Sequence, residues 1–176
     1  MKLTEVNEPW KHYIVEDFLE DDDFRKLQTF LDTLPVGQPN DRINLFITDN
    51  PEVSVLKEKF EDLLSDINFV SKRPYRIEVE YNSVGQDYHY PIHTDAVSKF
   101  ITLVLYVSPE DGQGTDIYYP DKTFHSEVKW KENSGLLFER KDNTLHSYKS
   151  TFSSRKTLNI ICLDADVKIK LCGRKY

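Results

Sequence analysis

The chain has 176 residues, of which 39% are hydrophobic and 12% aromatic, and a chain of this length can bury one substantial core. Its 30 acidic residues outnumber its 23 basic ones, and the formal charge of −7 disfavours nucleic acids and anionic membranes as partners. The sequence holds neither an export signal nor an apolar run of roughly 18 residues. We therefore expect a cytoplasmic protein with reduced thiols at Cys162 and Cys172.

Two helices are expected near the N-terminus. The first carries apolar side chains at spacings of three and one, which draw one stripe along a helix: Phe24, Leu27, Phe30, Leu31 and Leu34. Three aspartates at its start suit the positive end of the helix dipole. The second helix should run from about residue 51 to 65, with Asn50 as its cap and Pro51 in the first position. A short strand at residues 44–48 is expected between them.

After these helices the apolar period changes to two, which is typical of strands. Turn-forming residues separate eight candidate strands, at residues 75–81, 100–107, 115–119, 124–130, 135–139, 144–148, 156–163 and 166–172. Because no helix lies between them, the pattern excludes a doubly wound parallel sheet. It predicts a mainly β fold, a double-stranded β-helix (jelly roll) with two or more helices packed on one sheet. We expect one domain over residues 1–176, with helical support in 1–70 and the jelly-roll core in 75–172.

The stretch "YHYPIHTDAVSKFITLVLYV" contains two potential metal ligands, His93 and Asp95. On a strand these residues would project to the same face, with Cα atoms about 7 Å apart, and both could reach one ion. A His-X-Asp pair also arises often by chance. The pair needs a third ligand from elsewhere in the chain.

A non-haem iron site of the facial type uses two imidazoles and one carboxylate, which leaves three coordination positions open. Of the other histidines, His12 is expected in surface packing, His89 in a loop, and His125 in a surface pair with Glu127. His146 differs because it follows a buried apolar strand and a polar turn, on a short strand of its own. It is the best candidate for the second imidazole.

Nine residues after His146, Arg155 opens another apolar strand. A charged residue in this place is commonly a solvated strand end. If it points inward instead, its planar guanidinium can hold a carboxylate through two parallel hydrogen bonds. Thr157 would then lie on the same face and offer a hydroxyl to that carboxylate.

The order His93-X-Asp95, a gap of about fifty residues, His146, and then Arg155-X-Thr157 resembles the iron(II)/2-oxoglutarate-dependent dioxygenase superfamily, most of all its prolyl hydroxylase-like branch. That branch is a jelly roll with a metal triad in its mouth. Two further stretches, "YNSVGQDY" and "FITLVLYVSPEDGQGTDIYY", resemble the family's approach to the metal strand and its strand, loop and glycine-bearing turn. The resemblance implies that the two histidines and the aspartate hold Fe(II).

The same resemblance, which covers about residues 75–163, implies roles around the co-substrate. Arg155 would bind the distal carboxylate of 2-oxoglutarate, with Tyr106, Thr157 and Tyr81 near the same carboxylate or facing the co-substrate. With O₂ as the second co-substrate, such an enzyme hydroxylates an unactivated C–H bond and releases succinate and CO₂.

The substrate stays open between a peptidyl side chain, such as proline, and a small molecule. The family's alkylation-repair members have a second arginine six residues after the first; this chain has Ile161 there, which together with its charge argues against nucleic acid substrates. The expected rim segments carry Arg42, Tyr88, His89 and Tyr90. Two other classes remain possible. A cupin-type metal enzyme would not require Arg155, and a non-catalytic ligand-binding jelly roll would not require the triad.

Overall fold

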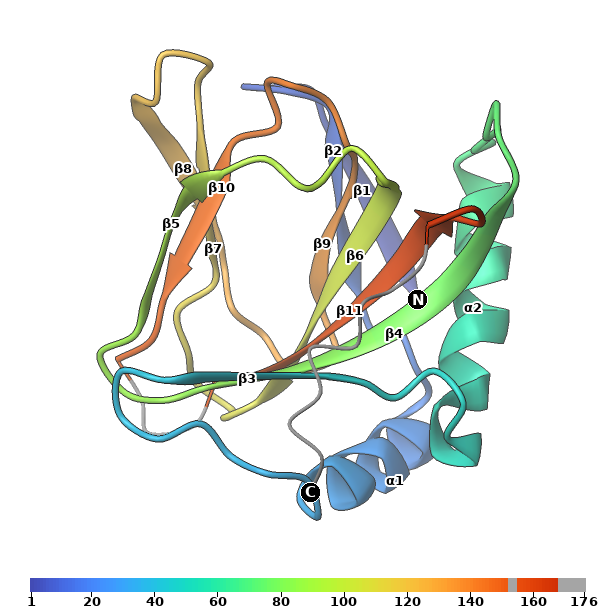
Figure 1. The fold of residues 1–176 in the computed structure, drawn as a ribbon, viewed down its shortest axis with the longest axis vertical. Coiled ribbons are helices and arrows are strands. Elements are labelled where there is room, and N and C mark those ends of the chain that lie inside the picture. The colour runs from blue at the N-terminus through green and yellow to red at the C-terminus, as the bar shows by residue number, and fades with distance from the viewer. Residues whose placement is uncertain (152–154, 168–176) are drawn as a thin grey trace.

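The computed structural model describes residues 1–151 and 155–167, and within them the chain forms two antiparallel sheets and two α-helices (Figure 1). The strands are β1 (Lys2–Val6), β2 (His12–Glu16), β3 (Arg42–Phe46), β4 (Tyr75–Val84), β5 (His89–His93), β6 (Lys99–Ser108), β7 (Thr115–Tyr118), β8 (Phe124–Val128), β9 (Gly135–Glu139), β10 (His146–Lys149) and β11 (Arg155–Asp164). The major sheet has the order β1-β2-β9-β6-β11-β4-β3, and the minor sheet the order β5-β10-β7-β8.

The major sheet has two chemically different faces, because successive side chains of a strand alternate between them. Strand β11 lies between β4 and β6 and pairs with both along most of its length. Its even-numbered residues Leu158, Ile160 and Cys162 are fully buried in the main hydrophobic core. Thr157 and Asn159 lie on the other face, which looks toward the minor sheet. One face of the major sheet therefore packs in the hydrophobic core, and the other face presents polar side chains toward the minor sheet.

Helices α1 (Asp21–Leu31) and α2 (Ser54–Asp66) lie on the side of the major sheet away from the minor sheet (Figure 1). Leu27 and Leu31 of α1 and Leu56 and Phe60 of α2 are essentially inaccessible to solvent and share one core with the sheet. A short 3₁₀ turn, η1 (Pro51–Val53), precedes α2, and the Asn50 side chain accepts a hydrogen bond from the amide of Glu52 at its start. Both predicted helices are confirmed, with ends shifted by a few residues.

The N-terminal segment contributes three strands to the major sheet, of which only the one near residues 44–48 was expected. Strands β1, β2 and β3 come from the first 46 residues and complete both edges of the major sheet. The positions of β1 and β2 at and next to one edge explain why these two strands were missed. Each has only one neighbour or lies next to the edge, and their half-exposed residues do not alternate cleanly between apolar and polar. The short strand expected at residues 44–48 is present as β3, two residues earlier.

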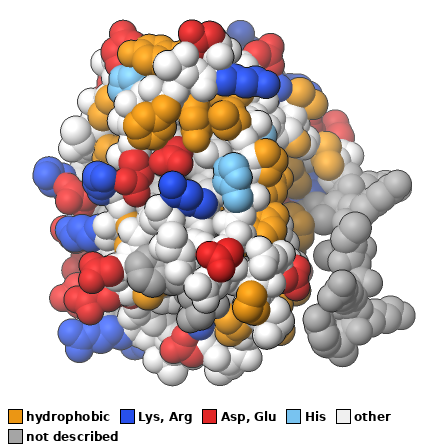
Figure 2. Space-filling model, turned by 90° about the vertical axis from the view of Figure 1, so that its left-hand side faces the viewer, with side chains coloured by type: hydrophobic (Ala, Val, Ile, Leu, Met, Phe, Trp, Pro, Cys, Tyr) orange, Lys and Arg blue, Asp and Glu red, His pale blue; other side chains and the backbone are white. Residues whose placement is uncertain are grey.

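The minor sheet forms the side of the molecule drawn in Figure 2, where acidic and basic side chains are interspersed around groups of apolar ones. Seven of the eight predicted strands after residue 72 are present. Of the eighth, residues 166 and 167 lie in or next to a turn, and residues 168–172 lie outside the described part of the chain. Cys162 is a buried free thiol, and Cys172 lies outside the described residues as well. No helix among the described residues is long and apolar enough to cross a membrane.

Candidate active site

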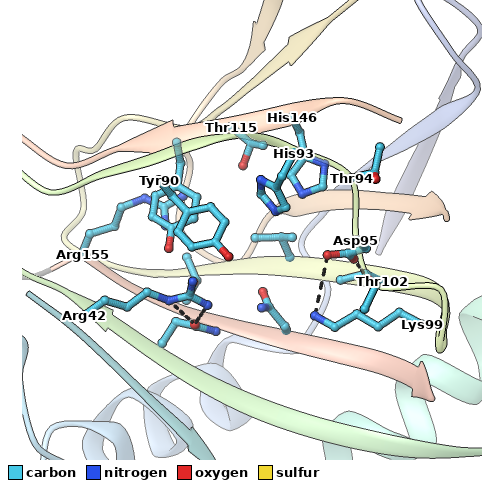
Figure 3. A pocket seen from close by; sticks show the side chains of 16 residues that line it. Arg42, Tyr90, His93, Thr94, Asp95, Lys99, Thr102, Thr115, His146 and Arg155 are labelled. Carbon is cyan, nitrogen blue, oxygen red and sulfur yellow. Dashed lines mark hydrogen bonds and ion pairs between the residues drawn. The ribbon is translucent and has the colours of Figure 1, made fainter. Parts of the chain in front are cut away.

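A cavity of about 210 Å³ lies between the polar face of the major sheet and the minor sheet (Figure 3). Strands β3, β4, β6 and β11 of the major sheet form one wall, and β5, β7 and β10 of the minor sheet form the other. The lining side chains are mostly polar or ionisable: Arg42, Asn82, Tyr90, His93, Thr94, Asp95, Lys99, Thr102, Thr115, His146, Tyr148, Arg155, Thr157 and Asn159. A buried polar surface of this kind needs a ligand or water to satisfy it.

Three potential metal ligands converge in this cavity. His93 ends β5 and His146 begins β10, and these two residues are direct partners in the register of the two strands. Asp95 follows two residues after β5 ends, in irregular backbone, so the expectation that it shares a strand with His93 is wrong. Nevertheless, one ligand atom from each of the three side chains lies within 4.8 Å of the other two. The irregular backbone that follows β5 therefore places the Asp95 carboxylate next to the two imidazoles.

The two imidazoles are held in the orientation that a metal requires. The Nδ1 atom of His93 lies 2.9 Å from the carbonyl oxygen of Pro91, and that of His146 lies 3.0 Å from the carbonyl of Thr144. A carbonyl oxygen only accepts, so Nδ1 carries the proton in each ring and leaves Nε2 with a lone pair. Burial lowers the pKa of His93 and lowers that of His146 to about 4, which keeps both rings neutral.

The carboxylate of Asp95 is ionised and fixed in place. Its Oδ2 accepts a hydrogen bond of 2.7 Å from the Thr102 hydroxyl, and its Oδ1 lies 3.7 Å from Nζ of Lys99. Burial opposes ionisation, but the charge of Lys99 and the hydrogen bond from Thr102 favour it, and the pKa of Asp95 lies below its usual value. Two neutral imidazoles and one carboxylate fit a divalent ion that keeps open coordination positions, as Fe(II) does in the facial triad.

Arg155 occupies the interior of the same cavity, with only 2% of its surface exposed. Its Nε donates to the carbonyl of Gln113 at 3.2 Å, and its Nη2 donates weakly to the carbonyl of Gly114 at 3.5 Å. The guanidinium carbon lies 4.5 Å from the ring centroid of Tyr148 and 5.0 Å from that of Trp130. Among the described residues no carboxylate pairs with it. A buried cation without an anionic partner is costly, and this one is therefore suited to receive an anion.

Thr157 lies on the same strand as Arg155, and the ring centroid of Tyr106 lies 5.8 Å from the Arg155 guanidinium carbon. Thr157 lines the cavity and is buried. Tyr106 pairs with Thr157 in the register of β6 and β11 and is fully buried, and its hydroxyl donates to Oγ1 of the cavity residue Thr115 at 2.9 Å. Burial raises the pKa of Tyr106 to about 12, so its hydroxyl stays protonated. Its hydrogen bond reaches the cavity wall through Thr115.

The structure corrects the placement expected for Tyr81. Its ring belongs to the core between the major sheet and the helices, and its hydroxyl donates to the carbonyl of Pro35 at 3.1 Å. The next residue, Asn82, lines the cavity instead. The reason is the alternation of side chains along β4, which sends residues 81 and 82 to opposite faces. Tyr81 therefore supports the fold and does not face the cavity.

Sequence reasoning missed Tyr148 as a cavity residue. Its hydroxyl is buried without a hydrogen-bond partner among the described residues, and burial raises its pKa to about 12. The signal was available, because Tyr148 follows His146 by two residues on the same short strand. Arg42, which the sequence placed only on a rim segment, also lines the cavity.

The remaining histidines lie outside the cluster of three potential ligands, but two predictions about where they lie are wrong. His12 is only 2% exposed and does not lie on the surface, because its Nδ1 contacts the carbonyl of Trp10 at 2.8 Å and its ring packs against the indole. His89 is exposed, but it lies on β5 and not in a loop. His125 is partly exposed on β8 and lies 2.8 Å from the Ser126 hydroxyl.

Solved structures with this fold share most of their length with the chain. A viral collagen prolyl hydroxylase, vCPH, from Paramecium Bursaria Chlorella virus-1, in its 2OG complex, has a TM-score of 0.66 at 17% identity, over 89% of this chain and 96% of its own. A prolyl hydroxylase from Trichoplax adhaerens, in complex with a hypoxia inducible factor peptide fragment, has a TM-score of 0.68 at 12% identity. The match covers 87% of this chain and 83% of its own. A Pseudomonas putida prolyl-4-hydroxylase has a TM-score of 0.65 at 14% identity, and the match covers 87% of this chain and 92% of its own.

Sequence comparison adds nothing to this structural likeness, since neither a family model nor a curated protein matches the chain. The identities are low, and the likeness is one of fold: two antiparallel sheets with helices against one of them. A protein described as a 2OG-Fe(II) oxygenase family member, from Burkholderia pseudomallei, also matches, with a TM-score of 0.61. The chain therefore shares its fold with these solved prolyl hydroxylases and with the Burkholderia pseudomallei protein.

Proposed function

We propose that this protein is an Fe(II)- and 2-oxoglutarate-dependent dioxygenase that hydroxylates an unactivated C–H bond. The observation that carries the proposal is the presence of two features in one cavity: three ligand atoms within 4.8 Å of one another, and a buried guanidinium that pairs with no carboxylate of residues 1–151 and 155–167. Either feature alone would also fit a different kind of site. Together they match the two ends of a keto acid that chelates a metal and carries a distal carboxylate.

His93, Asp95 and His146 would hold the metal ion. When bound, Fe(II) supplies the activation of O₂, with 2-oxoglutarate as the electron source, so that succinate and CO₂ leave and the substrate gains a hydroxyl group. The protein's own contribution is orientation. The backbone carbonyls at Nδ1 fix both imidazoles, and Thr102 fixes the carboxylate, so the ligands do not have to reorganise.

Arg155 would bind the distal carboxylate of 2-oxoglutarate through two parallel hydrogen bonds. Thr157 offers a hydroxyl beside it, and Tyr148 offers a hydroxyl that has no partner among the described residues. Tyr106 would act on the co-substrate indirectly, through Thr115, because its hydroxyl already donates a hydrogen bond to the Thr115 hydroxyl. A cupin-type enzyme that does not use a keto acid would leave Arg155 without an anion, so its burial argues against that class.

The same observations support two coarser inferences. The two facing sheets are consistent with a double-stranded β-helix, and residues 1–176 with a single domain, because strands from the N-terminal segment complete the major sheet. The cytoplasmic location stays a prediction. One structural neighbour is a prolyl hydroxylase in complex with a peptide, which keeps a peptidyl substrate open beside a small molecule.

The proposal is tested by measuring succinate formed from 2-oxoglutarate, together with 2-oxoglutarate binding in the absence of O₂. We expect slow succinate formation that requires Fe(II), even without a substrate, and tighter 2-oxoglutarate binding when metal is present. An Arg155→Ala variant should lose the binding, whereas an Arg25→Ala variant, which removes an exposed charge on α1, should keep it. No metal-dependent binding and no succinate would leave a non-catalytic ligand-binding protein as the better account.

A further inference from the structure

The cavity carries more positive charge than a metal and 2-oxoglutarate can explain. Among the described residues, the charged side chains that line it are three cations, Arg42, Lys99 and Arg155, and a single carboxylate, Asp95, which is an excess of two positive charges. A divalent ion would add two charges and the dianionic keto acid would remove two, so the excess persists in the loaded site. The whole chain has a net charge of −7, which makes a basic cavity a local feature.

Arg42 is the cation to which the proposed reaction assigns no role, because it binds neither the metal nor the distal carboxylate of 2-oxoglutarate. It begins β3, at the edge of the major sheet, and its side chain reaches into the cavity (Figure 3). Its Nε and Nη2 both donate to Oδ1 of Asn82, at 3.1 and 2.7 Å. A guanidinium has five N–H groups, and the Asn82 oxygen and the Tyr90 hydroxyl together satisfy only part of this donor set. Lys99 differs, because it already lies near Asp95.

No carboxylate in the described residues forms an ion pair with Arg42. Glu80 is the acidic residue that acts on its charge, but both of its oxygens are engaged elsewhere. Its Oε1 accepts from the amide of Asn44 and its Oε2 from the amide of Asn159, each at 2.9 Å. Glu80 therefore lowers the cost of a charge at Arg42 without occupying its donors.

Tyrosine rings hold the guanidinium in place. The guanidinium carbon of Arg42 lies 4.6 Å from the ring centroid of Tyr90 and 6.0 Å from that of Tyr148. These two rings stack, with centroids 5.3 Å apart and planes within 5°. Tyr88 stacks on Tyr148 from 6.4 Å. A cation held by a rigid aromatic stack loses little freedom when it binds a ligand, and this arrangement favours binding.

We propose that Arg42 binds a carboxylate of the substrate, so that the substrate class is a carboxylic acid. This inference rests on the proposed function and adds a second anion site to it. The geometry gives each guanidinium its own anion: Arg155, 2% exposed, faces the interior, whereas Arg42 is partly exposed at the edge strand β3. The planar fork of Arg42 matches the two oxygens of a carboxylate. The carboxylate can belong to a free small acid or to an acidic side chain of a peptide.

The test uses the full chain, loaded with Zn²⁺ as an inert metal and with 2-oxoglutarate. The probes are the N-acetyl derivatives of the common amino acids, each as the free acid and as the carboxamide, with binding measured by saturation-transfer NMR and then by titration. We expect the free acid of the best pair to bind about 10- to 100-fold more tightly than its amide. The amides of N-acetyl aspartate and glutamate form a separate arm, which reports on a side-chain carboxylate.

Arg42→Ala should remove the preference for the carboxylate and leave the dissociation constant of 2-oxoglutarate unchanged, which also shows that the variant is folded. Arg25→Ala, with the same change in net charge, should keep the preference. Equal binding of acids and amides, or no binding of either, would overturn the inference, as would a preference that survives in Arg42→Ala. If Arg42→Ala instead weakens 2-oxoglutarate, Arg42 belongs to the co-substrate site. If the wild-type chain binds neither metal nor 2-oxoglutarate, the proposed function itself fails.

Discussion

The two faces of the major sheet differ in function, although the same strands form both of them: one packs in the apolar core and the other lines the cavity. On the helix side, β11 places Leu158 and Ile160 in an apolar core that is closed to solvent. On the cavity side it places Arg155 and Thr157 among groups that are buried and incompletely paired. Residues of the first kind stabilise the fold, whereas those of the second kind cost stability and are explained by a ligand. Changes on the two faces should therefore affect different measurements.

The largest expected effect is on the cavity side. His146→Ala removes one of three ligands, and the remaining imidazole and carboxylate cannot hold a labile divalent ion well. We expect loss of Fe(II) binding in equilibrium dialysis, with the fold retained. Undiminished binding in this variant would contradict the triad.

The next effect lies on the helix side. Leu158→Ala leaves a void in the apolar core and should lower the free energy of unfolding by about 2 to 5 kcal/mol, as measured by urea denaturation of the metal-free protein. Thr157→Ala, one residue away on the cavity face, should lower it by less than about 1 kcal/mol. Equal losses in the two variants would mean that the two faces do not differ as described.

Arg155→Ala should raise the 2-oxoglutarate concentration needed for half-saturation by on the order of 10² to 10³, because a charge-assisted pair in a buried site contributes several kcal/mol. The measurement is a titration with 2-oxoglutarate in the presence of metal. An unaltered requirement would show that another cation, with Arg42 the first candidate, binds the distal carboxylate.

The metal-free protein should lose stability as the pH falls. In the unfolded chain His146 takes up a proton near pH 6.5, whereas burial lowers its folded pKa to about 4, so protons favour the unfolded chain between these values. At pH 5 the loss attributable to His146 is about 2 kcal/mol. Urea denaturation at several pH values in the presence of a chelator measures it, and His146→Asn should give a flatter profile. A profile equally steep in that variant would assign the effect to other groups.

The smallest expected effect belongs to His125→Ala. This histidine lies outside the triad, at Ser126 and Tyr119, and its removal should leave metal binding intact. Equilibrium dialysis with Fe(II) beside the His146→Ala variant makes the comparison direct. Loss of iron here would mean that the wrong histidine had been assigned to the metal.

Sequence reasoning succeeded where local pattern and strand pairing agree. The helices followed from one apolar stripe each. His93, His146 and Arg155, which were singled out by their order in the chain, line one cavity, and their roles stay predictions. It failed for β1, β2 and β5, which are edge strands or lie next to an edge and have mixed exposure. His89 was expected in a loop, but β5 begins at this residue, and its edge position tolerates Pro91, which lacks an amide donor.

The errors at the site have a similar physical origin. Tyr81 was assigned by resemblance, but a shift of one residue along β4 reverses the face, and only the register with β11 shows that Asn82 and not Tyr81 faces the cavity. The position of Arg42 in the cavity could not be predicted from the sequence, because it depends on the pairing of β3 with β4, which are separated by some forty residues of chain. Long-range pairing of this kind has no local signature in the sequence.

The most direct test of the account is a crystal structure of the protein with Mn²⁺ and 2-oxoglutarate, solved without O₂. We predict metal density at about 2.0 to 2.3 Å from His93, Asp95 and His146, and the distal carboxylate of the keto acid in a bidentate pair with Arg155. Density for the metal away from these three residues, or a keto acid that leaves Arg155 without an anion, would contradict the central claim.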